Sequence, residues 1–202
     1  MIRFLSFIVL LASGVWAQNM SDGIIALGKK LADNPDDDGI RLELARQYYL
    51  MGGYEEVFRL YDKKFSKSDA KPDEYKLYAA ARLKTFEYSN AMVKDFTRWF
   101  GADEKIRFAE MALEKSLAMN PQDPQAYFLL GMAKYFRTNY DESEVYFKQA
   151  LSYGVSFETF GFSDASVQLA TVLRTLKKFD EAIPLLEGRD DATMELFAIY
   201  LE

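Results

Sequence analysis

The chain has 202 residues, half of them hydrophobic, which is enough apolar material for one buried core or one array of repeats. Its formal charge is −6, from 25 basic and 31 acidic side chains, so the charge balance does not favour nucleic acid or an anionic lipid surface as a partner. The absence of cysteine and histidine excludes thiolate and imidazole catalysis and zinc sites built from those residues.

Residues 1–17 are typical of a secretory signal peptide. Arg3 precedes an apolar run over residues 4–11, and Val15 and Ala17 are the small residues that a signal peptidase selects. The run is too short to span a bilayer comfortably, so we expect cleavage, export to the periplasm or the medium, and no stable membrane insertion afterwards. The alternatives are an uncleaved anchor or a buried first helix.

One amphipathic helix is predicted next, over residues 21–33, and Pro35 ends it. It has no partner helix of its own, so we expect it to cap the amino end of a repeat array. Residues 38–71 then contain two helical patterns separated by a turn at Gly52 and Gly53. Within one repeat domain over residues 18–202, three further pairs and a closing capping helix are predicted over residues 72–123, 124–162, 163–189 and 190–201.

The pairs recur with a period that is interrupted twice. The first two begin 34 residues apart, at Asp38 and Pro72, but the third begins 52 residues later, at Pro124. The second pair therefore carries an insertion, which we place at residues 84–102 and expect to form a short amphipathic helix packed across the hairpin or along its rim. A smaller excess of five residues falls at residues 154–161. The insertion has bulky residues spaced to share one helical face, namely Met92, Phe96, Trp99 and Phe100.

The third pair shows the repeat pattern most fully. Its apolar positions are Tyr127, Leu130 and Gly131 in the first helix, and Phe147, Ala150 and Leu151 in the second. This stretch resembles a tetratricopeptide repeat (TPR), with Lys134 in the position of the second aromatic residue and Ser143 in the usual alanine position. We expect Gly131 to lie where the two helices come closest, because a larger side chain there holds the backbones apart.

The resemblance implies an all-α fold, a right-handed superhelix of about four TPR-like helical hairpins with partial capping helices at both ends. In this family the first helix of each hairpin lines the concave side, where ligands bind. Carried over by position, the candidate partner-binding residues are Arg46, Tyr49, Lys76, Phe128, Met132, Tyr135, Phe136 and Arg174, with Trp99 from the insertion.

This mixture of aromatic and basic residues suits an extended peptide with apolar side chains and a carboxylate. Aromatic rings supply rigid contact area, and an arginine holds a carboxylate through two parallel hydrogen bonds. The alternative is that the aromatic residues of the third pair pack against neighbouring helices. Trp99 likewise has two interpretations, a docking residue for a partner or a filler beside the second pair.

Acidic residues gather at several helix starts, and we attribute them to capping rather than to chemistry. Residues 34–39 look superficially like a calcium loop, but Ala45 stands where a bidentate glutamate is required, and Asp38 is expected to cap a helix. Two acidic pairs recur at the start of second helices, where they complement the helix dipole: Asp141 with Glu142, and Asp180 with Glu181. No catalytic residue, metal site or cofactor is predicted.

The sequence therefore predicts a non-enzymatic scaffold or assembly factor of the cell envelope that binds a protein or peptide in its concave groove. This step is an analogy from fold, which hosts many roles. The alternative is an accessory protein that binds a solute or lipid, with the insertion forming part of a pocket. The oligomeric state and the partner's identity stay open.

Overall fold

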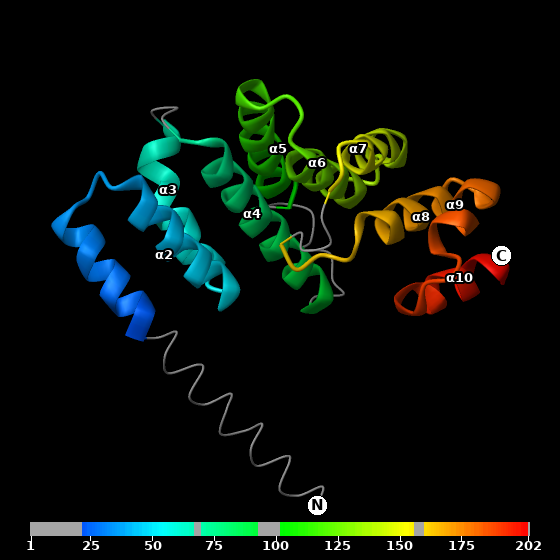
Figure 1. Ribbon diagram of the computed structural model, residues 1–202, viewed down its shortest axis with the longest axis horizontal. Helices are drawn as coiled ribbons and strands as arrows, with labels where there is room; N and C mark the ends of the chain where they lie inside the picture. The colour runs from blue at the N-terminus through cyan, green and yellow to red at the C-terminus, as the bar shows by residue number, and fades with distance from the viewer. Residues whose placement is uncertain (1–21, 67–69, 93–101, 156–159, 202) are drawn as a thin grey trace, which may run out of the picture. The chain divides into compact units, whose positions relative to one another are not determined.

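The computed structural model describes residues 22–66, 70–92, 102–155 and 160–201 (Figure 1). The predicted signal peptide and Trp99 lie outside these ranges. The chain divides between Ser68 and Asp69 into two compact units, which are described separately. The described residues form helices and turns and contain no strand, so the predicted all-α class is confirmed.

The first unit holds a helix over residues 22–33 and hairpin 1, formed by α2 (Asp38–Leu50) and α3 (Tyr54–Ser66). Ala45 is fully buried on α2, as the small residue of a close helix pair. The cap of α2 is Asp37 rather than the predicted Asp38, because the Asp37 carboxylate accepts a 2.9 Å hydrogen bond from the backbone N–H of Ile40. Asp38 instead forms an ion pair with Arg41 inside the first turn.

The second unit holds three hairpins and a closing helix (Figure 1). Consecutive helices pack against one another, α4 also packs against α6, and α10 packs against both α8 and α9. The elements are α4 (Pro72–Met92) and α5 (Ala102–Met119) in hairpin 2, α6 (Pro124–Phe136) and α7 (Tyr140–Ser152) in hairpin 3, α8 (Ala165–Thr175) and α9 (Phe179–Leu186) in hairpin 4, then the 3-10 turn η2 (Asp190–Ala192) and α10 (Thr193–Tyr200).

The first part of the insertion lengthens α4 instead of starting a separate helix. Residues 84–92 continue the helix that begins at Pro72, to a total of 21 residues. The physical reason is the absence of any glycine or proline between Asp73 and Met92, so nothing ends the helix at the predicted boundary. The remainder of the predicted amphipathic helix, at residues 93–101, lies outside the described residues.

Hairpin 3 is held by the close approach that its glycine permits. A Cβ placed on Gly131 would lie 2.7 Å from ring atoms of Phe147, a distance that real side chains do not adopt. Ser143, in the usual alanine position, is fully buried and donates a 2.8 Å hydrogen bond to the carbonyl oxygen of Gly131. The caps are Asp123, which accepts from two backbone N–H groups of α6, and Asn139, which accepts from Glu142 at the start of α7.

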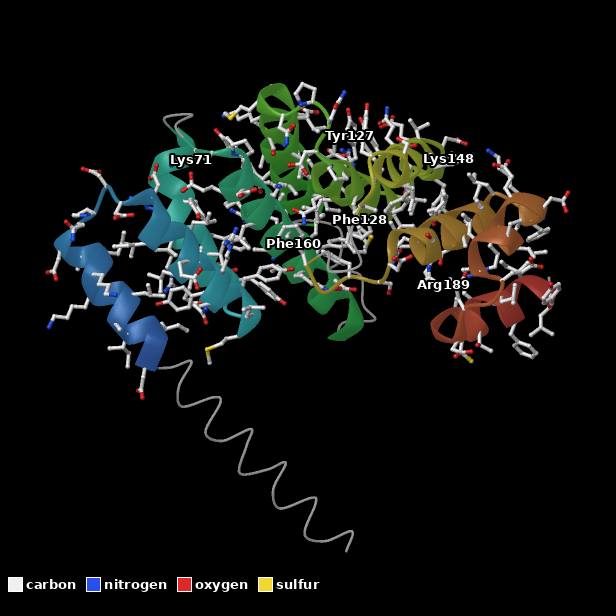
Figure 2. The ribbon with its side chains drawn as sticks, viewed as in Figure 1. Lys71, Tyr127, Phe128, Lys148, Phe160 and Arg189 are labelled. Carbon is white, nitrogen blue, oxygen red and sulfur yellow. The ribbon has the colours of Figure 1, made fainter. Side chains whose placement is uncertain are left out.

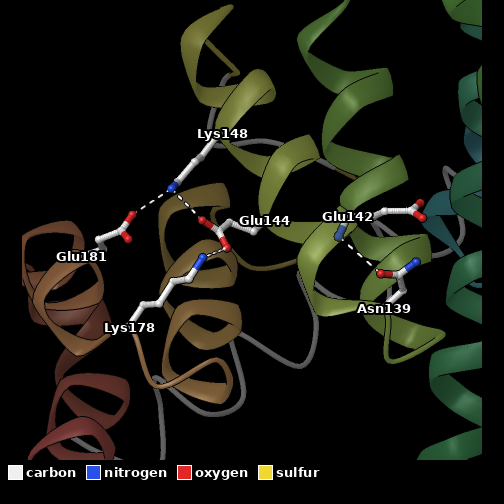
Figure 3. A network of polar contacts seen from close by, with 6 residues as sticks. All are labelled: Asn139, Glu142, Glu144, Lys148, Lys178 and Glu181. Carbon is white, nitrogen blue, oxygen red and sulfur yellow. Dashed lines mark hydrogen bonds and ion pairs between the residues drawn. The ribbon is translucent and has the colours of Figure 1, made fainter.

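Within the second unit, two buried glutamates that are 34 residues apart tie hairpin 2 to hairpin 3 and hairpin 3 to hairpin 4. Glu110 of α5 pairs with Lys134 at 3.1 Å and with Arg137 at 3.0 Å, both from hairpin 3. Glu144 of α7 pairs at 2.7 Å with Lys148 of its own helix and with Lys178 at the start of α9. Figure 3 shows this second network, which Glu181 extends by a 2.8 Å contact with Lys148.

The loop between hairpins 3 and 4 folds back onto α4. The Lys84 ammonium donates a 2.7 Å hydrogen bond to the carbonyl oxygen of Gly161 and lies 3.9 Å from the centroid of the Phe162 ring. Phe160 and Gly161 both have positive φ angles, of 52° and 65°, which turn the chain toward α4. The described end of this loop, at residues 160–162, thus contacts hairpin 2.

Candidate functional site

The two candidates in hairpin 1 have different surroundings. Arg46 is exposed on α2. Tyr49 is buried, and its ring meets that of Tyr54 edge to face at 5.3 Å across the turn of the hairpin. Both belong to the first unit, so they are not placed with the candidates of the second.

Lys76 is buried and forms ion pairs that connect α4 to the start of α6. Its ammonium lies 2.7 Å from a carboxylate oxygen of Asp123 and 2.9 Å from one of Asp73, and it donates to Gln125 at 3.2 Å. Burial lowers the pKa of Lys76, but the hydrogen bonds and charges of the two aspartates outweigh it and raise the pKa above its ordinary value. Since Asp123 also caps α6, Lys76 holds hairpin 2 to hairpin 3, and we leave it out of the candidate surface.

Phe128 and Met132 belong to the core. They are 0 % and 2 % exposed, which leaves no area for a partner. The Phe128 ring lies 5.6 Å from that of Phe147 and 6.3 Å from that of Phe162, which arrives from the loop before α8 (Figure 2 labels Phe128 and, in that loop, Phe160). The chain therefore covers this part of the first-helix face with its own aromatic residue, and both residues are removed from the candidate set.

The remaining three candidates come together at the end of α6. Tyr135 and Phe136 are half-buried neighbours whose ring centroids are 5.9 Å apart. The Phe136 ring packs at 5.0 Å on Phe86 of the extended α4, and Tyr135 meets Tyr140 of α7 at 5.9 Å. Arg174 of α8 completes the group. We define the aromatic–arginine surface as the partly exposed residues Tyr135, Phe136, Tyr140 and Arg174.

A carboxylate of the closing helix already lies on this surface. The Arg174 Nε atom is 2.9 Å from a carboxylate oxygen of Glu195 in α10, and both side chains remain partly exposed. Burial raises the pKa of Tyr135, and Tyr140 and the negative charge of Glu195 raise it further, while Arg174 acts in the opposite direction. The Tyr135 hydroxyl therefore lies within the field of the Arg174–Glu195 pair and stays protonated at neutral pH.

Sequence reasoning missed Phe86, Tyr140 and Glu195. Tyr140 had a usable signal, because it is the aromatic residue that opens the second helix directly after the turn following Phe136. Phe86 was not predicted because it lies in the expected insertion, which in the structure continues α4. Glu195 had no signal in the sequence, because its meeting with Arg174 depends on how α10 packs against α8.

Comparison with known proteins agrees with this architecture. Residues 124–153, which are hairpin 3, match the tetratricopeptide repeat family. A thermophilic TPR protein of Thermus thermophilus superposes with a TM-score of 0.66 at 17 % identity, over 95 % of this chain and 96 % of its own. The structure of MamA superposes with a TM-score of 0.64, also at 17 % identity, over 92 % of this chain and 94 % of its own. No curated protein matches the chain by sequence.

The chain thus has the fold of TPR proteins, and one of its hairpins is recognised as a TPR from sequence alone. Among the described residues, no helix has the length and apolarity needed to cross a membrane. In the same residues, no group of three or more acidic side chains is arranged to hold a metal ion.

Proposed function

We propose that this chain is a non-enzymatic interaction module that binds a protein or peptide segment through its aromatic–arginine surface. The supporting observation is the convergence of Tyr135, Phe136 and Arg174 from two different hairpins onto one partly exposed site. The TPR fold supports the same class of role, because stacked hairpins offer extended surfaces for partners. Fold alone is an analogy, so the proposal depends on the site.

The chemistry of the site defines the segment it suits. The rings of Tyr135 and Phe136 are rigid and only half-buried, so an apolar or aromatic side chain gains contact area there at a low cost in side-chain entropy. Arg174 has a planar guanidinium that already holds one carboxylate. A partner with an acidic residue next to an apolar residue therefore competes with Glu195 for Arg174 while its apolar side chain covers the rings.

A pull-down tests this binding. The full chain and a Tyr135→Ala, Phe136→Ala variant are used as bait in an extract of the source cells. The matched control is Tyr146→Ala, Tyr153→Ala, which removes two rings from the same hairpin that stack on Tyr127 instead. We expect the first variant to lose partners that the control retains, after thermal unfolding has shown that both are folded. If the first variant retrieves every partner unchanged, recognition by these residues is wrong.

We further propose that the chain acts outside the cytoplasm, in the cell envelope. The support is the apolar segment at residues 4–11 followed by Val15 and Ala17. Amino-terminal sequencing of the protein purified from its own cells tests this proposal, and the expected first residue is Gln18. A protein that retains Met1 and Arg3 in the soluble cell fraction contradicts it.

A further inference from the structure

The closing helix α10 packs against α8 and α9 (Figure 1), and two of its side chains anchor it there. A carboxylate oxygen of Glu195 lies 2.9 Å from the Nε atom of Arg174 in α8, and the two side chains are 20 % and 25 % exposed. Ile199 is buried. Because positions four apart lie on the same side of a helix, Glu195 and Ile199 form a single docking face.

This docking face is small enough for another segment to reproduce it. Ile199 is the one buried residue among the eight of α10, whereas five residues of α8 are buried. Ala192, which precedes α10, makes no side-chain cap. Met194 and Phe197 are exposed, so they add little to the attachment. One ion pair and one buried aliphatic side chain thus supply much of the contact.

The same helix carries the chemistry that the aromatic–arginine surface offers to a partner. Glu195 occupies Arg174 as a partner's carboxylate would, and the next residue, Leu196, is apolar. After burial and Tyr140, the charge of Glu195 is the next cause that raises the pKa of Tyr135. The Glu195 carboxylate therefore acts on the aromatic part of the surface as well as on the guanidinium.

We propose that α10 is an internal ligand that holds Arg174 until a helical segment of a partner protein takes its place. The displacing segment has a glutamate and, four residues later, an aliphatic residue, because α10 docks through these two positions. This inference rests on the proposed function, since it concerns what the same surface binds. It adds that the surface is occupied in the free chain, so that binding a partner is an exchange in which hairpins 2 to 4 stay packed.

A peptide with the sequence of residues 190–201 serves as the probe for this exchange. It is labelled with a fluorophore, and its binding to the full chain is measured by fluorescence anisotropy. The native chain should bind it weakly, because the tethered α10 competes for the same contacts. Glu195→Gln in the chain removes the charge that holds α10 to Arg174. It should tighten peptide binding about threefold to fivefold, the factor expected of one partly exposed ion pair.

A second peptide tests the same contact without altering the chain. It has glutamine in place of its glutamate, and it should bind the native chain more weakly than the first peptide does. Glu181→Gln is the matched control in the chain, because Glu181 also belongs to hairpin 4 but pairs with Lys148, and it should leave peptide binding unchanged. In an Arg174→Gln chain, adding Glu195→Gln should have no further effect. Thermal unfolding shows whether each variant is folded.

Three outcomes overturn the proposal. The Glu195→Gln chain binds the peptide no more tightly than the native chain does, the two peptides bind equally, or the tightening persists in the Arg174→Gln chain. Weaker binding to Glu195→Gln would identify Glu195 as a residue that orients Arg174 for a partner. Each outcome can occur while the Tyr135→Ala, Phe136→Ala variant still loses partners in the pull-down, so the failure of this proposal is distinguishable from the failure of the proposed function.

Discussion

Hairpins 3 and 4 have different residues at the two equivalent positions where their helices are expected to meet. In hairpin 3 the contact between the helices pairs Gly131 with Phe147, and in hairpin 4 the same two positions, 39 residues later, hold Ala170 and Leu186. All four are buried. The larger ring of Phe147 requires a residue without a Cβ, whereas a buried alanine and a smaller buried leucine occupy the equivalent positions of hairpin 4. Combined volume, more than residue type, defines this position.

The turns of the two hairpins differ in a related way. Asn139 caps α7 through its side chain, but the corresponding Lys178 makes no cap and reaches Glu144 of the preceding hairpin instead. Helix α9 is also short, at eight residues, and contains Pro184. The residue before the second helix thus contacts the preceding hairpin in hairpin 4, whereas in hairpin 3 it caps its own helix. The match to the TPR family covers hairpin 3 and ends at residue 153.

The largest effect expected from this comparison is that of Gly131→Ala. The added methyl group would lie 2.7 Å from the Phe147 ring, so the helices must separate or the ring must leave its rotamer. We expect a loss of about 2–3 kcal/mol in the free energy of unfolding, measured by urea denaturation with circular dichroism. Ala170→Gly in hairpin 4 should cost only about 1 kcal/mol, through helix propensity.

A second substitution sharpens this test. Combining Gly131→Ala with Phe147→Leu recreates the residue pair of hairpin 4 inside hairpin 3. The two changes should be less destabilising together than the sum of the single changes, with a coupling of about 1 kcal/mol or more. If the free-energy changes of the two single variants simply add in the double variant, the two side chains do not compete for the same space.

The Glu144 network gives the next largest effect, as a dependence of stability on pH. Burial opposes the ionisation of Glu144, but hydrogen bonds from Lys148 and Lys178 outweigh it and lower the pKa below its ordinary value of 4.5. A group whose pKa is lower in the folded state contributes stability above its unfolded pKa, and this contribution is lost as the pH falls through the folded value. The free energy of unfolding should therefore decrease below about pH 4.5.

Glu144→Gln identifies the source of this dependence. The substitution should cost roughly 1–2 kcal/mol at neutral pH, since two partly exposed lysines lose their shared carboxylate, and it should flatten the acid limb of the stability curve. Glu181→Gln is the control, because Glu181 is half-exposed and pairs only at the edge of the network, so roughly 0.5 kcal/mol or less is expected. Equal losses of stability in the two variants would contradict the interpretation that Glu144 is a buried link between hairpins 3 and 4.

The smallest effect concerns the two turns themselves. Thr138 and Lys177 both have φ near +60°, but Thr138 is β-branched and is strained more in that region. We expect Thr138→Gly to raise the free energy of unfolding by about 0.5 kcal/mol, and Lys177→Gly to change it by less. A thermal melting temperature that falls in Thr138→Gly would show that the threonine makes a compensating contact.

Helix starts and close contacts were predictable because they follow from local chemistry. Pro72 and Pro124 open helices at the predicted residues, since proline fits the first turn and a repeat of small and bulky residues follows. Gly131 was identified as a contact point from its spacing alone, and the structure confirms it. The cap of α2 was misassigned by one residue because three consecutive aspartates, residues 36–38, stand at the start of the helix, and side-chain direction decides between them.

The candidate site was only partly predictable, because it depends on contacts between hairpins. From their positions in the repeat, Phe128 and Tyr135 were both predicted to lie on the first helix of hairpin 3 and to bind a partner. The structure separates them, since the loop before α8 covers Phe128 with Phe162 and leaves Tyr135 half-exposed. The partner of Arg174 could not be predicted either, because Glu195 comes from a helix whose packing no local sequence pattern specifies.

The contact of Lys84 with Gly161 and Phe162 has a consequence for how the second unit unfolds. In arrays of repeats each unit usually touches only the next, so the ends melt first and partly folded states accumulate. Here a residue of hairpin 2 binds the segment that introduces hairpin 4, so neither can come apart without disturbing the other. Residues 69–202 should therefore lose their structure in a single cooperative transition rather than peel away from α10 inwards.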